Sequence, residues 1–429
     1  MGSFVVEPML PFDEFVAVED DNRRLNWVLE ALPDEELLRH LWEERDGHRN
    51  EYPPGMLWRC VVAKFVYQIK TYAELIRELW RNASLRRIVG CEGRVPQDYH
   101  FSRFLKRLSS PECLALIEGM FDELVERCWG ELEGFGRFLA VDATAVHAYS
   151  NEEKKQKSDP DAAWSRRPKR RRVGRGEGQL EEGLEAWLGY SVHLVIDCAS
   201  ELPVGYRVTP ANVNETLLFR PMLTELGERH PRVSQATEAV MADAGYDSRE
   251  NCEHVLRELK ALPIIKMRLT QGRDEVCQAA LCCCTELGTP ICPSGHRMVY
   301  WGRDGQYLKW RCPAKVGRRP QECTFRGGCG TPSEYGRVLK LSLWEDPRRW
   351  PGMWRESRKF ERLYKKRTAV ERVNSRLKEH LLLDDLTIRG IEKVRVHVRV
   401  GLVVMLAGAW AMARAGHEER MRKTVRLAA

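Results

Sequence analysis

The chain has 429 residues, a hydrophobic fraction of 43%, a charged fraction of 31% and a formal net charge of +7. This composition excludes an intrinsically disordered protein, and the length predicts two or three domains rather than one core. The positive charge is compatible with a polyanionic partner but does not require one. The longest uncharged run, Val400–Ala413, is too short to span a bilayer and predicts a buried helix.

The fourteen cysteines include three consecutive ones at 282–284. The N-terminus lacks the basic start and the apolar stretch of a secretory signal. We therefore expect a cytoplasmic protein without a membrane partner, whose cysteines are free or bound to metal. The three consecutive cysteines have no predicted function.

Helices are predicted for the first part of the chain. Residues 1–50 are expected to form an N-terminal arm with one helix at Asp34–Glu44. Apolar residues then recur at three- and four-residue spacing, which predicts a helical domain over residues 51–134. One of the helices predicted within this domain, Tyr99–Leu108, has a basic outer face.

An α/β core is predicted from residue 135 onward, in two parts separated by an insert. A β-branched run around Asp142 is followed by the basic segment Glu152–Gly176. We interpret this segment as a solvated loop or, alternatively, as a loop that contacts DNA phosphates. Further strands and helices are predicted at 190–197, 202–211, 214–227 (helix), 237–248, 250–260 (helix) and 262–265. This order predicts a mixed sheet flanked by helices, with residues 135–267 as its first part.

A cysteine-rich β insert is predicted over residues 268–335, with a hairpin at Asp304-Gly305. Four cysteines could form a zinc site, with His296 as an alternative ligand: Cys292, Cys312, Cys323 and Cys329. So short a segment has little core of its own, which favours zinc. The spacing contains no CxxC knuckle, so buried free thiols are the alternative. The core is expected to resume over 336–385, before a helical segment and basic tail at 386–429.

One long helix, Trp354–His380, is predicted to carry Tyr364, Arg367, Glu371 and Lys378. At about 100° per residue, the last three of these residues share a narrow face and the tyrosine flanks it. A carboxylate between two cations on one helix face suits a metal-bound phosphate better than it suits packing.

Two aspartates upstream could complete an acidic site with Glu371. Asp142 lies within one predicted strand and Asp243 at the end of another, and sites in α/β sheets form at strand ends. Two divalent cations about 4 Å apart, held by such carboxylates, can cleave a phosphodiester. Taken singly, each residue is as readily a turn former or a solvated charge. Asp247 is a weaker candidate and is expected to cap the next helix.

These motifs resemble the DDE transposases of bacterial insertion sequences, in the group with a Tyr-Arg-Glu-Lys signature. The matching segments are VDATAVHA, GYSVHLVID, LPVGYRVTPANVNE, VMADAGYDS and YKKRTAVERVNSRLK. The resemblance spans about residues 15–415. It implies a ribonuclease-H-like fold, cleavage at transposon ends and transfer of the 3′-hydroxyl strand to target DNA. A nuclease that only cleaves and a non-catalytic DNA-binding regulator derived from a transposase are the alternatives.

The resemblance also implies roles for individual residues. Asp142, Asp243 and Glu371 would be catalytic and hold Mg²⁺ or Mn²⁺. The residues expected to bind DNA are Tyr364, Arg367 and Lys378 near the scissile bond, and Arg103, Lys106 and Arg107 on the helix Tyr99–Leu108. An ordinary amphipathic helix explains the last three nearly as well. The implied partner is double-stranded DNA, bound by a homodimer at the nucleoid.

Overall fold

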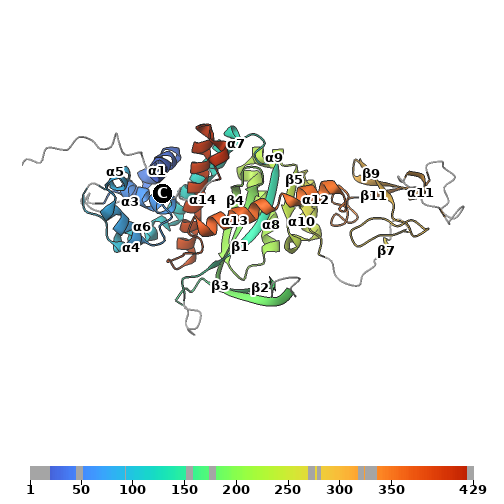
Figure 1. The fold of residues 1–429 in the computed structure, drawn as a ribbon, viewed down its shortest axis with the longest axis horizontal. Coiled ribbons are helices and arrows are strands. Elements are labelled where there is room, and N and C mark those ends of the chain that lie inside the picture. Colours follow the sequence, from blue (N-terminus) through green and yellow to red (C-terminus); the bar gives the residue numbers. More distant parts are fainter. Residues whose placement is uncertain are drawn as a thin grey trace, which may run out of the picture.

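The protein is elongated, with N-terminal helices, a central mixed sheet and a small outlying sheet following one another along its long axis (Figure 1). The computed structural model describes residues 20–44, 52–91, 93–150, 158–172, 180–268, 276–277, 282–316, 323 and 336–422.

Helices make up the chain before the sheet. They are α1 (Asp20–Ala31), α2 (Glu35–Glu43), α3 (Pro54–Val66), α4 (Tyr72–Arg81), α5 (Ala83–Val89), α6 (Asp98–Leu108) and α7 (Pro111–Glu131). Leu25 and Val28 of α1 and Leu41 of α2 are fully buried in the main core. The predicted helix Asp34–Glu44 is confirmed as α2, whereas the expectation of an arm is wrong for residues 20–44, because they pack into the main core. Their apolar residues, three and four positions apart, bury one face of each helix.

Side-chain caps determine where several helices begin. Thr71 accepts a hydrogen bond from the Glu74 amide at 3.1 Å, and the Glu74 carboxylate accepts one from the Thr71 amide at 3.1 Å. This reciprocal pair satisfies two amides that the first turn of α4 leaves open. Ser110 caps α7 by accepting a hydrogen bond from the Cys113 amide at 3.2 Å, and Pro111 follows it in the first turn.

The central sheet has the strand order β4-β3-β1-β5-β6. Its strands are β1 (Phe138–His147), β3 (Leu180–Asp197), β4 (Leu202–Pro210), β5 (Ala239–Ala242) and β6 (Leu262–Ile265). β3 runs antiparallel to β1 and β4, whereas β1, β5 and β6 are parallel. This topology confirms the predicted ribonuclease-H-like mixed sheet. β5 is buried throughout because helices cover the parallel half of the sheet.

The basic segment after β1 is not a loop throughout. Residues Ala163–Arg172 form β2, which pairs antiparallel with the outer half of β3. β3 is 18 residues long and extends beyond the sheet, so it offers a free edge there. The predicted loop is therefore wrong for this stretch.

Helices α8 (Glu215–Arg229), α9 (Pro231–Ala236) and α10 (Arg249–Arg257) connect the later strands. The predicted helix Trp354–His380 is instead two helices, α12 (Arg358–Lys365) and α13 (Thr368–Glu379). At the junction the Arg367 amide donates to the Tyr364 carbonyl, three residues back, and the Thr368 hydroxyl donates to the Lys365 carbonyl at 2.9 Å. These local bonds interrupt the regular i→i−4 pattern. α12 packs on β5 and β6, and α13 packs on β1 and β3.

The insert contains its own sheet and its own core. β9 (Val299–Asp304), β10 (Tyr307–Arg311) and β11 (Val338–Ser342) pair antiparallel around the predicted turn at Gly305. Trp310 is fully buried there among Met298, Leu308 and other apolar side chains. The expectation that this segment lacks a core is therefore wrong. β11 also belongs to this sheet and not to the second part of the catalytic core. The remaining short elements are β7 (Val276–Cys277), β8 (Cys282–Cys283) and α11 (Pro313–Val316).

Helix α14 (Ile391–Arg414) is long and apolar enough to cross a membrane by length and composition alone. However, 67% of its most apolar window is buried within the protein. It packs against α7, α1 and β4, beside the N-terminal helices (Figure 1). The helix is thus part of the core, as its uncharged run predicted.

Candidate active site

Asp142 and Asp243 are neighbours because of the parallel register between β1 and β5. The last paired positions are Val141 and Ala242, and each aspartate is the next residue in its own chain segment. Adjacent strands lie about 4.8 Å apart, so the two carboxylates leave neighbouring backbones. Asp243 also begins the 3₁₀ turn η2 (Ala244–Tyr246), where its Oδ1 accepts a hydrogen bond from the Gly245 amide at 2.7 Å.

Asp142 is held against helix α13 by two side chains. Its Oδ2 lies 3.8 Å from the Arg367 guanidinium and accepts a hydrogen bond from Asn374 Nδ2 at 3.3 Å. Only 19% of its side chain is exposed. Burial raises the pKa of Asp142 to about 7; Arg367 opposes this shift and Asp243 adds to it. A carboxyl group with such a pKa is typical of functional sites.

Glu371 is near the two aspartates but does not join them. Its carboxylate bonds to Arg367, one helical turn earlier, and 53% of its side chain is exposed. Among the described residues, neither Glu371 nor Glu215 completes with Asp142 and Asp243 a group of three ligand oxygens that all lie within 4.8 Å of one another. Arg367 instead lies between Asp142 and Glu371 and neutralises both.

The other two residues of the fourfold signature have different surroundings. The Arg367 guanidinium carbon lies 5.9 Å from the centre of the Tyr364 ring, and burial raises the pKa of the Tyr364 hydroxyl. Lys378 forms an ion pair with Asp384 at 3.3 Å. Tyr364 therefore lies at the site beside Arg367, whereas Lys378 is engaged at the end of α13.

Sequence reasoning did not single out Glu215 or Tyr246, which the structure brings to the same place. Glu215 is the first residue of α8 and ends the motif LPVGYRVTPANVNE. Burial and the nearby Asp243 raise its pKa, and Arg268 opposes the shift. Tyr246 is 1% exposed, and its hydroxyl has no hydrogen-bond partner. Both residues lie in segments that carry the family resemblance, but no spacing rule connects residues 31 positions apart.

The residues at this site fit a divalent cation such as Mg²⁺ or Mn²⁺. Asp142, Asp243 and Glu215 offer carboxylate oxygens, which are hard ligands of the kind these ions prefer. Two buried polar atoms beside them, the Tyr246 hydroxyl and Asn374 Oδ1, lack hydrogen-bond partners. Arg367 supplies positive charge to Asp142, and Arg268 supplies it to Glu215.

Asp247 does not cap α10, contrary to its expected role. The cap is the next residue, Ser248, whose hydroxyl accepts a hydrogen bond from the Asn251 amide. Asp247 forms a two-pronged ion pair with Arg348, at 2.6 and 3.1 Å, and accepts a bond from the Arg268 amide. It therefore ties the end of the site to the segment after the insert.

Helix α6 matches the predicted helix Tyr99–Leu108 to within one residue. Arg103 and Lys106 are exposed, and Arg103 lies 5.4 Å from the Tyr99 ring. Arg107 instead bonds to the Leu41 carbonyl and pairs with Glu44 at 3.3 Å. Two of the three basic residues on this helix are thus free to contact a polyanion, whereas the third holds α6 to α2.

The proposed zinc ligands stay a prediction. Cys292, Cys312 and Cys323 are partly exposed, and Cys323 Sγ lies 3.5 Å from the Ser294 hydroxyl. In the described part of the chain they do not form a group of three potential ligands within 4.8 Å. Cys329 lies outside the described residues.

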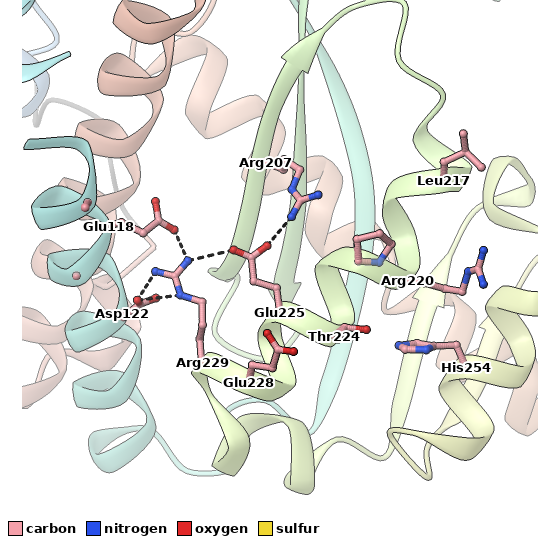
Figure 2. A pocket seen from close by; sticks show the side chains of 13 residues that line it. Glu118, Asp122, Arg207, Leu217, Arg220, Thr224, Glu225, Glu228, Arg229 and His254 are labelled. Carbon is pink, nitrogen blue, oxygen red and sulfur yellow. Dashed lines mark hydrogen bonds and ion pairs between the residues drawn. The ribbon is translucent and has the colours of Figure 1, made fainter. Parts of the chain in front are cut away.

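A cavity of about 1010 Å³ lies between α7 and α8. Its lining does not include Asp142, Asp243 or Glu215. Figure 2 shows Arg229 at its wall, bonded to Glu118 and Asp122 of α7 and to Glu225 of its own helix. This charged network joins the N-terminal helices to the catalytic sheet. We assign it a structural role, because its charges are already paired.

A group of three potential metal ligands, His40, Glu44 and Cys113, lies where α2 meets α7. Glu44 already pairs with Arg107 and lies 3.2 Å from His40, and burial raises the pKa of the Cys113 thiol. A neutral thiol beside a neutralised carboxylate makes a poor metal site. This group is therefore better explained as a helix contact.

Comparison with known proteins identifies two matching families. Residues 133–406, which contain Asp142, Asp243 and Glu371, match the family described as the transposase DDE domain, and residues 11–107 match a second family described as a transposase domain. No curated protein matches the chain significantly. A solved piggyBac transposase synaptic complex with hairpin DNA is similar at 10% identity, with a TM-score of 0.38, over 95% of this chain and 80% of that chain. The two family matches take in both the N-terminal helices and the sheet.

Proposed function

Since the chain belongs to the transposase DDE domain family, we propose that it binds the ends of an insertion element, cleaves phosphodiester bonds there and joins the 3′-hydroxyl strand to target DNA. The observation that supports this most is the register that sets Asp142 beside Asp243, under a helix carrying Arg367 and Glu371. Phosphoryl transfer needs clustered carboxylates and a nearby cationic group in this combination.

Asp142, Asp243 and Glu371 are proposed to hold a pair of Mg²⁺ or Mn²⁺ ions. Such ions activate the attacking water or hydroxyl and stabilise the leaving oxygen. Glu371 has to exchange its bond to Arg367 for this role. The released guanidinium would then bind a DNA phosphate, which Arg recognises well through paired hydrogen bonds. Tyr364, beside it, would contact the terminal nucleotide.

The helical region before the sheet is proposed to bind double-stranded DNA, mainly through phosphates. Arg103 and Lys106 are exposed on α6 and are the residues we assign to this contact. Lys378 would add a phosphate contact after leaving Asp384. We propose that the protein acts as a homodimer on paired ends, at the nucleoid in the cytoplasm.

The test uses purified protein, Mg²⁺ and DNA that carries the ends of the element. A transposase releases 3′-hydroxyl ends and joins them to a second duplex. A nuclease stops after cleavage, and a regulator binds without cutting. Replacing Asp142, Asp243 or Glu371 with Ala is expected to reduce cleavage at least about 1000-fold, because metal ligands are lost, while DNA binding persists. Cleavage that survives in any one variant removes that residue from the site.

A further inference from the structure

Glu215 and Asp243 point their carboxylates to the same side of the turn η2. A Cβ placed on Gly245 would lie 2.6 Å from Oε1 of Glu215 and 2.8 Å from Oδ1 of Asp243. Both oxygens thus converge on a space that exists only because residue 245 has no side chain. The pair is therefore closely juxtaposed, although 28 residues separate them in the chain.

The start of α8 is fastened to η2, so this juxtaposition is built into the fold. The Thr216 hydroxyl donates to the Gly245 carbonyl at 2.6 Å. Asn251, which is 1% exposed, donates to the Tyr246 carbonyl at 2.9 Å and to the Thr216 carbonyl at 3.5 Å. These bonds leave Glu215 little freedom to move away from Asp243.

A buried hydroxyl without a partner lies among the same carboxylates. Tyr246 is 1% exposed, its hydroxyl makes no hydrogen bond with any residue that the structure describes, and its electrostatic neighbours are Glu215, Asp142, Asp243 and Arg367. Buried polar atoms are nearly always satisfied in folded proteins. An unsatisfied hydroxyl beside three carboxylates indicates a ligand-binding site. Because the surrounding carboxylates are negatively charged, the ligand has to be a cation.

We propose that Glu215 is a further ligand of the divalent-cation centre, and that it binds the cation together with Asp142 and Asp243 before DNA arrives. This inference rests on the proposed metal-dependent function. Glu371 is bonded to Arg367 in the same conformation, so it is not needed for this first binding event. The three carboxylates come from β1, from the end of β5 and from the first turn of α8.

The test measures Mn²⁺ binding by the full-length, DNA-free protein, by electron paramagnetic resonance or calorimetry. Glu215→Gln is expected to weaken Mn²⁺ binding at least tenfold, and Glu371→Gln less than threefold. Glu228→Gln removes the same charge from an exposed position of α8 and serves as the matched control. Unchanged binding by Glu215→Gln, or an equal loss in Glu371→Gln, overturns the inference.

Two further measurements separate a direct role from misfolding. Glu215→Gln relieves carboxylate repulsion, so its melting temperature in EDTA is expected to equal or exceed that of the wild type. Gly245→Ala keeps every charge but displaces both carboxylates, and it is expected to weaken Mn²⁺ binding severalfold; normal binding by this variant contradicts the proposed site.

The same measurements distinguish the role of Glu215 from the proposed metal-dependent function. If the wild type cleaves DNA with Mg²⁺ while Glu215→Gln binds Mn²⁺ normally, only the role of Glu215 is refuted. If the wild type neither binds Mn²⁺ nor cleaves, the metal-dependent function is refuted as well.

Discussion

The guanidinium of Arg367 lies between two carboxylates, 3.8 Å from Oδ2 of Asp142 on one side and hydrogen-bonded to Glu371 on the other. Arg367 comes at the junction of α12 and α13, immediately before the first residue of α13. In this position it compensates the charge of a buried aspartate and also keeps Glu371 away from the aspartates. The proposed metal binding and the proposed DNA binding would therefore both involve the same arginine.

Replacing Arg367 with Gln is expected to destabilise the metal-free protein by about 1–3 kcal/mol at pH 8, because Asp142 loses its counter-charge. In the Asp142→Asn variant, Arg367→Gln should lower the free energy of unfolding by clearly less than it does in the wild type. Urea unfolding in EDTA measures both effects, with Lys359→Gln, an exposed change on α12, as the control. Equal losses in the two backgrounds would show that Arg367 does not act on Asp142.

The stability of the metal-free protein should fall as pH rises from about 4 to 7. Burial raises the pKa of Asp142 to about 7, whereas an unfolded aspartate titrates near 3.9. Between these values the folded protein holds a proton that the unfolded chain has released, so raising the pH favours unfolding.

Asp142→Asn should remove this slope. The free energy of unfolding of this variant should exceed that of the wild type by an amount that grows about 1.4 kcal/mol per pH unit and reaches a few kcal/mol by pH 7. The measurement is the free energy of unfolding in EDTA at several pH values. A difference between the two proteins that stays constant from pH 4 to 7 would refute this assignment.

Trp310→Ala is expected to unfold the insert locally, at a cost of about 3–5 kcal/mol, because it empties the centre of a small core. Trp301, on the neighbouring strand, is 54% exposed, so Trp301→Ala should change stability by less than about 0.5 kcal/mol. Limited proteolysis should cut the Trp310 variant within residues 282–342. If a zinc ion is the main support of the insert, chelation will expose these sites more than Trp310→Ala does.

Arg229→Ala should loosen the contact between α7 and α8, because it leaves Glu118, Asp122 and Glu225 without their shared cation. We expect a loss of about 1–3 kcal/mol at pH 7. Arg220 lines the same cavity, is exposed, and provides the matched control (Figure 2). Hydrogen exchange in α7 reports the loosening, and unchanged exchange in the Arg229 variant would refute the assigned structural role.

Local patterns predicted much of this protein. The apolar run LPII became β6 over the predicted residues, and the β-branched run around Asp142 became β1, because short buried strands depend mainly on their own residues. The same patterns placed Asp142 within one strand and Asp243 at the end of another. Their adjacency followed from the parallel order of the sheet.

Long-range packing decided what the sequence left open. Glu215 reaches Asp243 only because Thr216 and Asn251 bind α8 to η2, and Asn374 reaches Asp142 only because α13 lies on β1. The interruption between α12 and α13 at Arg367 likewise depends on a turn that the spacing of apolar residues does not predict. Periodicity describes which side of an element is apolar, and it cannot say which distant element will cover that side. The amino-acid sequence thus determined the strands and the two aspartates, and the tertiary structure decided which cation and which further carboxylate they meet.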